Sequence, residues 1–271
     1  MIVEEFFNLL IEELKQNPHL TGYYRFLNNP ELYEYRKAYF CQRLQYISDH
    51  IPENKNIKIF DIGCGYGTTA IFLVLNRYKV NGITLEYYYE QINNRKAYWS
   101  KIGDLKNLGI HYENLFDKPL LLSTYNVIIA QDVLHHIEPI TSALNIISKS
   151  LIANGKLIAC EENGNNILNT IRLFFKRQNK RIIQFYDDRL DKNILMGNEN
   201  IHSLKKWTTQ ISKSGLLIDK DSVQYIRLFF PWKYKRKAAK DIIQREQEIW
   251  KKNVFVKEYF FHGLNFTATK K

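Results

Sequence analysis

Apolar residues in the first fifty positions recur at intervals of three and four, the spacing of one face of an α-helix. An amphipathic helix is expected in MIVEEFFNLLIEELKQN, and a second helix from about Glu31 to Ser48. The aromatic turn LTGYYRFLNNP separates the two. The pattern therefore predicts a helical cap over residues 1–52.

From residue 57 to residue 162 the pattern changes to short apolar runs that alternate with longer helical periods. Strands are expected at IKIFDI, YKVNGITL, GIHYENL, YNVIIAQ and GKLIACEE. Helices are expected between them, over residues 68–77, 87–102 and 140–151. Strands that alternate with helices of about 10 to 15 residues are typical of a parallel α/β sheet. We therefore expect a Rossmann-like α/β core with helices on both faces.

After residue 162 the alternation becomes weaker. Residues 163–200 are polar and basic, with some helical pattern and no obvious strand. A helix over residues 203–215, a strand over 217–229, a basic helix over 233–251 and a final strand over 254–270 are expected to follow. Residues 1–271 contain no internal repeat and no linker that would divide them. We expect one domain made of the cap, a core over 57–162, an acceptor-side insertion and helix over 163–215, and late strands with a basic helix over 216–271.

Composition limits the class of protein. Hydrophobic residues make up 45% of the chain, enough for a buried core, and no apolar run approaches the ~20 residues that span a bilayer. The N-terminus is acidic where a secretory signal would be basic. Three unclustered cysteines, Cys41, Cys64 and Cys160, argue against a disulfide framework or a structural zinc site. A reducing cytoplasm is the expected location.

The formal net charge of +11 is concentrated in part in two basic clusters, Arg172–Arg181 and Lys233–Lys240, each with five basic residues and no acidic one. Such clusters are found where a protein binds RNA, a membrane surface or a phosphorylated substrate. They also occur as solvated helical faces without a partner. Charge alone does not choose between these interpretations.

The segment FDIGCGYGTTA contains the most informative chemistry. Gly63, Gly65 and Gly67 follow a strand and open a helix, so that the backbone can approach a ligand closely. A dinucleotide-binding loop would have another glycine at Thr68, and its pyrophosphate would be repelled by Asp61. A ligand with an amine near the loop and no phosphate fits better.

S-adenosylmethionine has an α-amino acid at one end and adenosine at the other, and so fits this description. Glu86 supports it, because it follows the next strand, 19 residues after Gly67, where an acid accepts hydrogen bonds from ribose hydroxyls. Asp61 and Thr68 both argue against a dehydrogenase, so NADH fluorescence should not change on mixing.

Together with the glycine loop and GITLE, the segment YNVIIAQDVLHHIEP resembles the class I S-adenosylmethionine-dependent methyltransferases. The branch it most resembles methylates quinones, lipids, sugars and other small metabolites. The resemblance covers residues 57–162 and implies a seven-stranded sheet whose last strand is antiparallel. It also implies S-adenosylmethionine as cofactor, S-adenosylhomocysteine as product and no metal.

The resemblance assigns cofactor-binding roles residue by residue. Asp61, Gly63, Gly65 and Gly67 would line the methionine half, and Glu86 would hold the ribose. Asn114 stands where the family usually has an aspartate facing the adenine amino group, and an amide oxygen can also accept that N–H. The softer assignments are Leu85 and Leu115 around the adenine ring and Gln131 beside the methionine moiety.

Methyl transfer needs a general base only when the acceptor must lose a proton. Candidates follow the fourth and fifth expected strands, at His135 and His136 and at Glu161 and Glu162, with one member of each pair expected to point into the site. Either pair could equally shape the wall without acting as a base. A lid over the acceptor could come from aromatic residues of the cap, namely Tyr23, Tyr24, Phe26, Tyr33 and Tyr39.

The leading interpretation is an enzyme that methylates an oxygen or nitrogen of a small metabolite, such as a sugar, a glycan precursor or a natural-product intermediate. Three alternatives stay open. The first is an RNA methyltransferase that uses the basic clusters, although the usual signatures for base amines and base carbons are missing. The others are a methyltransferase of lipid or lipid-linked substrates at a membrane surface, and a protein that holds the cofactor without catalysis.

Overall fold

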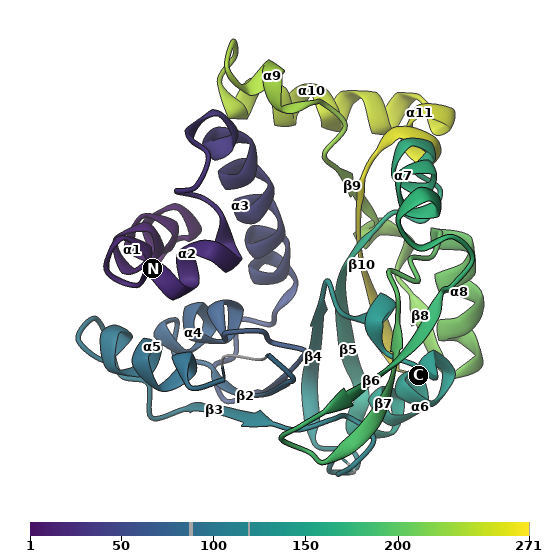
Figure 1. Ribbon diagram of the computed structural model, residues 1–271. Helices are drawn as coiled ribbons and strands as arrows, with labels where there is room; N and C mark the ends of the chain where they lie inside the picture. Colours follow the sequence, from purple (N-terminus) through teal and green to yellow (C-terminus); the bar gives the residue numbers. More distant parts are fainter. Residues whose placement is uncertain (87–88, 119, 271) are drawn as a thin grey trace.

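The computed structural model describes residues 1–86, 89–118 and 120–270 (Figure 1). Its centre is an eight-stranded sheet with the path β3-β2-β1-β4-β5-β10-β8, and β9 pairs with β10 beside this path. The strands are β1 (Lys58–Ile62), β2 (Lys79–Thr84), β3 (Leu108–Tyr112), β4 (Tyr125–Gln131), β5 (Leu151–Glu162), β8 (Leu216–Ile218), β9 (Gln224–Ile226) and β10 (Gly263–Lys270). The first five pair in parallel, whereas β10 is antiparallel to its neighbours. The expected α/β fold with an antiparallel last strand is confirmed.

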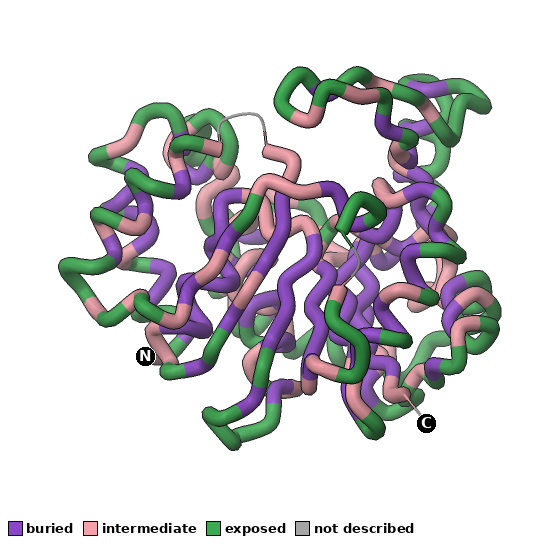
Figure 2. Tube along the Cα trace, turned by 90° about the horizontal axis from the view of Figure 1, so that it is seen from below, coloured by how far each residue is buried: buried purple, intermediate pink, exposed green. Residues whose placement is uncertain are grey.

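Helices pack on both faces of this sheet, because its central strands are apolar on both sides. In β4, Val127 and Ile129 face a core shared with α1 (Val3–Gln16), α3 (Tyr33–His50), α4 (Thr68–Leu75) and α5 (Gln91–Trp99). Ile128 and Ala130 face a second core with α6 (Ile140–Ser150) and α8 (Leu204–Lys213). Figure 2 shows the strands buried along most of their length and the outer helices exposed. Among the described residues, no helix is both long and apolar enough to cross a membrane.

The cap consists of α1, α2 (Pro18–Tyr24), the 3-10 turn η1 (Pro30–Leu32) and α3, which cover the side of the sheet that carries β1 to β3 (Figure 1). The expected helices are therefore present, and α2 is an additional one. The expected helix over 87–102 is described only in part, as α5, because Tyr87 and Tyr88 lie outside the described residues.

The expectation of no strand in residues 163–200 was wrong. This segment forms α7 (Ile167–Arg177) and then a hairpin of β6 (Ile182–Asp187) and β7 (Lys192–Gly197). The hairpin turn is stabilised locally, because Asp187 Oδ1 accepts hydrogen bonds from the N–H groups of Arg189 and Leu190 at 3.0 Å each. The remaining stability comes from pairing between the two half-exposed strands. Their sequences lack the strong alternation of apolar and polar residues that would predict a strand.

Three further boundaries differ from the expected ones. The single strand over 217–229 is divided into β8 and β9 by the turn η3 (Lys220–Ser222), whose Asp221 N–H is accepted by the Asp219 side chain. The first half of the expected last strand is instead α11 (Val254–Phe260), because Asn253 Oδ1 caps it by accepting the Val256 N–H. The expected basic helix over 233–251 is α9 (Pro231–Tyr234) followed by α10 (Ala239–Lys252).

Candidate active site

A cleft of about 910 Å³ opens at the carboxyl ends of β1, β2 and β4. This is the edge at which open parallel sheets bind their ligands. The end of α2 and the start of α3 line one wall, and the β6–β7 hairpin contributes Phe185, Ile194, Leu195 and Met196 to another. Eight of the nine residues predicted to bind cofactor line this cleft; the ninth, Gly67, lies below it at the start of α4.

The glycine loop between β1 and α4 needs its glycines for both conformation and space. Gly63, Gly65 and Gly67 have φ of 62°, 56° and 77°, a region that side chains disfavour. A Cβ on Gly63 would lie 2.2 Å from Val133 Cγ2, and one on Gly67 would lie 2.4 Å from Ile110 Cδ1. The Cys64 N–H donates to Ile83 O at 3.0 Å and fastens the loop to β2. The loop is thus rigid and lies close to its neighbours.

Asp61 is a buried carboxylate whose Oδ2 has no hydrogen-bond partner. Burial raises the pKa of Asp61 to about 8. Because burying a charge without a partner is costly, this oxygen suits a ligand that brings a cationic or N–H donor. The α-amino group of S-adenosylmethionine is such a donor, so the residues present fit the cofactor that the sequence predicts.

Glu86 lies just beyond β2 in the same cleft, and burial raises its pKa. The Glu86 carboxylate accepts a hydrogen bond from the Tyr23 hydroxyl. The backbone N–H of Glu86 donates to Thr84 Oγ1 at 3.1 Å. Tyr23 also lies against the glycine loop, since a Cβ on Gly65 would be 3.0 Å from its hydroxyl. The sequence suggested Tyr23 only as part of a lid, yet this cap residue contacts the predicted ribose-binding acid.

The remaining predicted cofactor residues form the sides of the cleft. Asn114 is buried and its Oδ1 accepts the Phe116 N–H at 2.9 Å, which orders the turn after β3. Gln131 Oε1 accepts a hydrogen bond from Thr69 Oγ1 at 2.9 Å. Leu85 and Leu115 line the cleft near Glu86 and Asn114. Polar groups and an apolar side wall are therefore available together, as adenosine requires.

Three of the four candidate catalytic residues do not line the cleft. Glu161 is buried behind it, where its carboxylate accepts the N–H groups of Val133 and Leu134, the latter at 2.8 Å, and the Nδ1–H of His135. Burial alone would lower the pKa of His135, but the Glu161 carboxylate outweighs it and raises that pKa to about 9. Glu162 accepts a hydrogen bond from Asn169 Nδ2 at 2.7 Å. Neither Glu161 nor Glu162 lines the cleft, and both accept hydrogen bonds from neighbouring protein groups, so a catalytic role for this pair stays a prediction.

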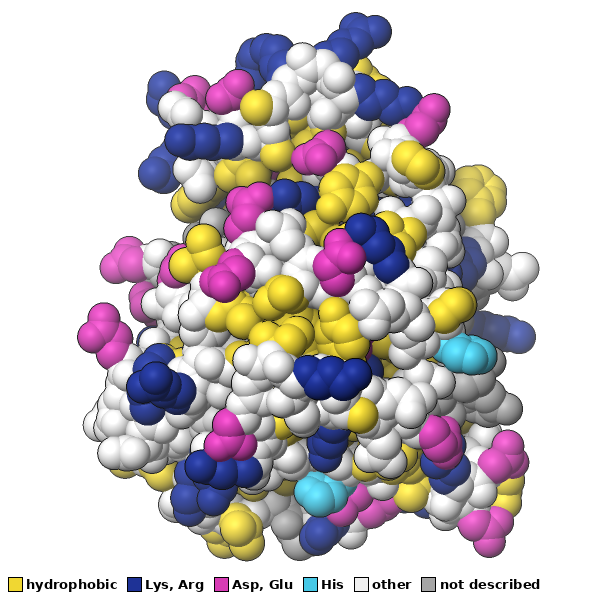
Figure 3. Space-filling view, turned by 90° about the vertical axis from the view of Figure 1, so that its left-hand side faces the viewer, with side chains coloured by type: hydrophobic (Ala, Val, Ile, Leu, Met, Phe, Trp, Pro, Cys, Tyr) yellow, Lys and Arg dark blue, Asp and Glu magenta, His cyan; other side chains and the backbone are white. Residues whose placement is uncertain are grey.

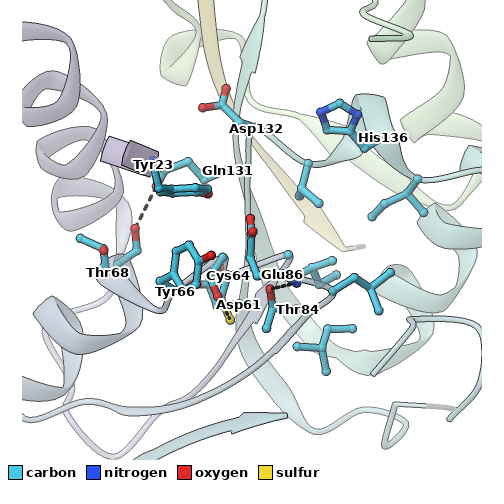
Figure 4. Close-up of a pocket in the computed structure, with 18 of the residues that line it drawn as sticks. Tyr23, Asp61, Cys64, Tyr66, Thr68, Thr84, Glu86, Gln131, Asp132 and His136 are labelled. Carbon is cyan, nitrogen blue, oxygen red and sulfur yellow. Dashed lines mark hydrogen bonds between the residues drawn. The ribbon is translucent and has the colours of Figure 1, made fainter. Parts of the chain in front are cut away.

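His136 is the catalytic candidate that does line the cleft. Its Nδ1–H donates to the carbonyl oxygen of Gly197 at 2.9 Å, which leaves the Nε2 lone pair as an acceptor. Burial, together with the charge of the neighbouring His135, lowers the pKa of His136. His136 is therefore a neutral imidazole near neutral pH. In Figure 4 its ring and Asp132 lie above the glycine loop and Glu86.

Sequence reasoning missed an ionic group on the acceptor side of the cleft. Arg43, from α3, is buried and pairs with Asp132, and its Nη2 donates to Cys160 O at 3.1 Å. Arg227 lies over the ring of the same Tyr39 that Arg43 contacts. The guanidinium carbons of Arg43 and Arg227 are 4.9 and 4.6 Å from the Tyr39 ring centroid. Asp132 belongs to the DVLHHIEP segment that carried the resemblance, but neither arginine belongs to a recognisable motif.

Among the described residues, His135, His136 and Glu199 place potential metal-ligand atoms within 4.8 Å of one another. The Nε2 of His135 is 3.9 Å from Glu199 Oε2, while Lys176 Nζ lies 3.8 Å from the other oxygen of Glu199. Transfer of a methyl group from a sulfonium needs no Lewis acid. The three side chains can thus accept a metal, but the reaction does not require one.

Comparisons with known proteins agree with the geometry of the cleft. A family model described as "Methyltransferase domain" matches residues 32–216. No curated protein sequence matches the chain. Similar solved structures include an S-adenosylmethionine-dependent methyltransferase from Mesorhizobium loti, with 13% identity, a TM-score of 0.51, and coverage of 85% of this chain and 97% of that one.

Two enzymes with named substrates are also similar in structure. Phosphoethanolamine N-methyltransferase 2 from Haemonchus contortus, solved with S-adenosyl-L-methionine, has 14% identity and a TM-score of 0.57 over 85% of this chain and 52% of that one. Geranyl diphosphate C-methyltransferase from Streptomyces coelicolor A3(2) has 15% identity and a TM-score of 0.58 over 90% and 85%. At these identities the likeness shows the fold, while the family match covers more than half of the chain. The chain therefore belongs to the class I S-adenosylmethionine-dependent methyltransferases.

Proposed function

We propose that this enzyme transfers the methyl group to an oxygen or nitrogen of a small metabolite that carries an anionic group. Candidates are phosphorylated or carboxylated sugars, glycan precursors and natural-product intermediates. The observation that carries the proposal is that one cleft holds the unpaired Asp61 carboxylate near the glycine loop, and both His136 and Arg227 farther away.

On the cofactor side, Asp61 accepts hydrogen bonds from the α-amino group, and the glycine loop lets the backbone contact the methionine moiety. Glu86 holds the ribose hydroxyls, with Tyr23 keeping its carboxylate in place. Asn114 faces the adenine amino group between Leu85 and Leu115, and Gln131 lies beside the methionine moiety. When bound, S-adenosylmethionine supplies a methyl group on a sulfonium that is already a good leaving group. The contribution of the protein is then mainly to orient the reactants and exclude water.

On the acceptor side, His136 is positioned to take a proton from an acceptor hydroxyl as it attacks, or from an acceptor ammonium group before the resulting amine attacks. The Gly197 carbonyl oxygen fixes the ring by accepting its Nδ1–H, so the basic Nε2 is the nitrogen left for the acceptor. A general base of this kind contributes typically about 10²- to 10⁴-fold in rate. His135 and Glu161 act behind His136 by fixing the turn from which it projects.

The anionic group of the acceptor is proposed to pair with Arg227. Arg43 is already neutralised by Asp132, whereas Arg227 is held by the Tyr35 hydroxyl and the face of Tyr39. Two of the similar enzymes, named for phosphoethanolamine and geranyl diphosphate, act on phosphorylated substrates, which supports this choice. A guanidinium is also the side chain best suited to bind a carboxylate or phosphate in two places.

The RNA alternative receives less support. No residue of either basic cluster lines the cleft. The second cluster, Lys233–Lys240, extends from α9 to the start of α10, and Figure 3 shows lysine and arginine side chains gathered over these helices at the top of the molecule. The basic side chains of the two clusters therefore form no part of the walls of the cleft.

The test is transfer of labelled methyl from S-adenosylmethionine into an extract of the host lacking this gene, separated into RNA, lipid, protein and small-molecule fractions. Asp61→Asn serves as the control with weakened cofactor binding, and Asp104→Asn, at an exposed aspartate, as the matched control with unchanged activity. Label in small molecules retained by anion exchange would support the proposal. Nuclease-sensitive label in RNA would overturn it, as would label in protein or no transfer at all.

A further inference from the structure

Helix α7 has its apolar face turned away from the protein. Its buried positions are Asn169, Leu173 and Arg177, spaced four residues apart on one face. Most of the exposed positions are large apolar residues, namely Ile167, Leu168, Ile171, Phe174 and Phe175, and the others are Thr170, Arg172 and Lys176. A surface helix of a globular protein normally has the opposite arrangement, with its apolar stripe toward the core. The side chain of Phe175 is 80% exposed, the largest exposure among the large apolar residues described.

Polar contacts at both ends, together with the buried Leu173, hold α7 in place. Asn166 caps the helix by accepting the Asn169 N–H at 2.8 Å, and Asn169 Nδ2 donates to Glu162 at 2.7 Å. At the other end, Arg177 Nη1 donates to Asn198 O at 2.5 Å and also to Glu199 O. The outward apolar side chains contribute little to these contacts. Large exposed apolar patches of this kind mark interaction surfaces.

The adjoining helix α11 extends this feature. It has no buried residue, and the side chains of Val254 and Phe255 are each 62% exposed. Asn166 Nδ2 donates to Phe260 O at 2.8 Å and joins the start of α7 to the end of α11. Figure 1 shows α7 directly beside α11. We call the outward side chains of these two helices the α7–α11 surface.

The charge around α7 indicates the kind of partner. The sequence has no acidic residue between Glu162 and Asp187, whereas it has five basic ones there, in and just after α7. Helices that lie in a membrane interface combine phenylalanine and aliphatic residues on one face with lysine and arginine beside them. Each basic side chain adds attraction to anionic headgroups. An RNA partner would leave the aliphatic side chains exposed to water. A protein partner with a neutral apolar groove would leave the basic side chains without counter-charges.

We propose that the α7–α11 surface docks this enzyme on the surface of an anionic lipid bilayer. The phenylalanine and aliphatic side chains enter the boundary between headgroups and acyl chains, while Arg172 and Lys176 pair with phosphates. Docking places the membrane near the acceptor wall of the cleft, because Arg177 binds the loop whose Gly197 carbonyl positions His136. The proposal concerns where the enzyme works and does not require the acceptor to be a lipid.

The experiment is co-sedimentation of the full chain, without cofactor, with vesicles of phosphatidylcholine and phosphatidylglycerol at three to one, and with vesicles of phosphatidylcholine alone. Binding to the anionic vesicles, weakened by salt, is expected. Leu168→Ser/Phe175→Ser should reduce it at least about tenfold, because each apolar side chain removed from the interface loses its burial. Arg172→Gln/Lys176→Gln should reduce it about fivefold per charge.

Leu121→Ser/Leu122→Ser is the matched control, since both leucines are exposed apolar residues outside α7 and α11, and it should bind as the parent does. Unchanged cofactor affinity in all variants would show that each is folded. The proposal is overturned if the parent does not bind anionic vesicles, or if Leu168→Ser/Phe175→Ser binds them equally well. It is also overturned if that variant instead abolishes binding to RNA or converts a dimer to a monomer. None of these outcomes depends on the identity of the methyl acceptor.

Discussion

The guanidinium of Arg95 in α5 and the carboxylate of Glu13 in α1 form a two-point ion pair that is almost completely buried. Arg95 Nε donates to Glu13 Oε1 at 2.9 Å and Nη2 to Oε2 at 2.7 Å, and the side chains are 0% and 2% exposed. Arg95 Nη1 also donates to Tyr66 O, in the glycine loop, at 2.8 Å. This pair joins the cap to the loop that is proposed to bind cofactor.

The first prediction concerns the stability that this pair provides. In Glu13→Gln the Arg95 charge stays buried without its counter-charge, so the free energy of unfolding should fall by about 3–5 kcal/mol. The adjacent Glu12→Gln removes an exposed pair with Lys15, 2.7 Å apart, and should cost less than about 1 kcal/mol. Urea unfolding followed by circular dichroism measures both. Equal losses in the two variants would show that the buried pair does not hold the cap.

Asp61→Asn should raise the stability of the protein without cofactor and weaken the binding of cofactor. The pKa of Asp61 in the folded protein, about 8, lies above its ordinary value of 3.8. Its ionised form is therefore disfavoured by folding, and stability from this group is lost as pH rises from 3.8 toward 8. At neutral pH the melting temperature of the asparagine variant should be about 2–4 °C higher than that of the parent, since asparagine carries no charge to desolvate. Scanning calorimetry without cofactor tests this, and a lower melting temperature would contradict it.

Cofactor affinity should show the opposite response to the same substitution. A hydrogen bond to a charged group is worth about 1.5–3 kcal/mol, so Asp61→Asn should raise the Kd for S-adenosylmethionine at least about tenfold. The parent should bind more tightly as pH rises toward 8, because Asp61 ionises, while the variant should lack this dependence. Titration calorimetry at several pH values, with Glu86→Ala as a second cofactor variant, measures both effects. If both substitutions leave affinity unchanged, the cofactor placement is wrong.

The core of the fold could be predicted from sequence because its signals are local. An apolar strand, a glycine loop and a helix follow one another within FDIGCGYGTTA, and the three positive φ angles of the loop favour glycine. Gly63 and Asp61 could thus be placed before any tertiary contact was known. The β6–β7 hairpin could not, because its strands are stabilised by each other and by the His136 turn, to which Gly197 bonds.

The acceptor side of the site was predictable only in part. Adjacent histidines in DVLHHIEP indicated that one would face the cleft, but which one depends on contacts distant in sequence. His135 is turned inward by Glu161, 26 residues away, and His136 is held by Gly197, 61 residues away. Arg43 and Arg227 come from segments outside the matched core, and no local pattern places them at the same tyrosine.

His136→Gln should lower kcat with the identified acceptor by about 10²- to 10⁴-fold and leave the Kd for cofactor unchanged. Because the pKa of His136 is lowered from its ordinary value of 6.5, the parent should keep its full rate at neutral pH and lose it only on acidification. His135→Gln is the comparison: it breaks the bond to Glu161 and should act mainly through stability. Equal kcat values for His136→Gln and the parent would exclude His136 as the base.

Arg227→Gln should raise KM for an anionic acceptor about ten- to a hundredfold, because a charge-assisted hydrogen bond across the cleft is lost. The value of kcat should change little, since Arg227 is proposed to bind the acceptor rather than act on the reacting atoms. Arg36→Gln is a useful control, as Arg36 also lines the cleft but is half-exposed and donates to the Arg25 carbonyl oxygen. An equal effect of both substitutions on KM would point to general charge attraction instead of a specific contact.

Removal of metal ions should not change the rate. Transfer from a sulfonium to an acceptor deprotonated by His136 requires no Lewis acid, so kcat after treatment with EDTA should equal kcat before it. The group formed by His135, His136 and Glu199 makes this a demanding test, because its ligand atoms lie within 4.8 Å and both histidines donate Nδ1–H to protein oxygens, as metal-binding histidines do. A different outcome would assign these side chains to a working metal centre. In that outcome EDTA abolishes the activity of the parent, one divalent metal restores it, and Glu199→Gln shows neither response.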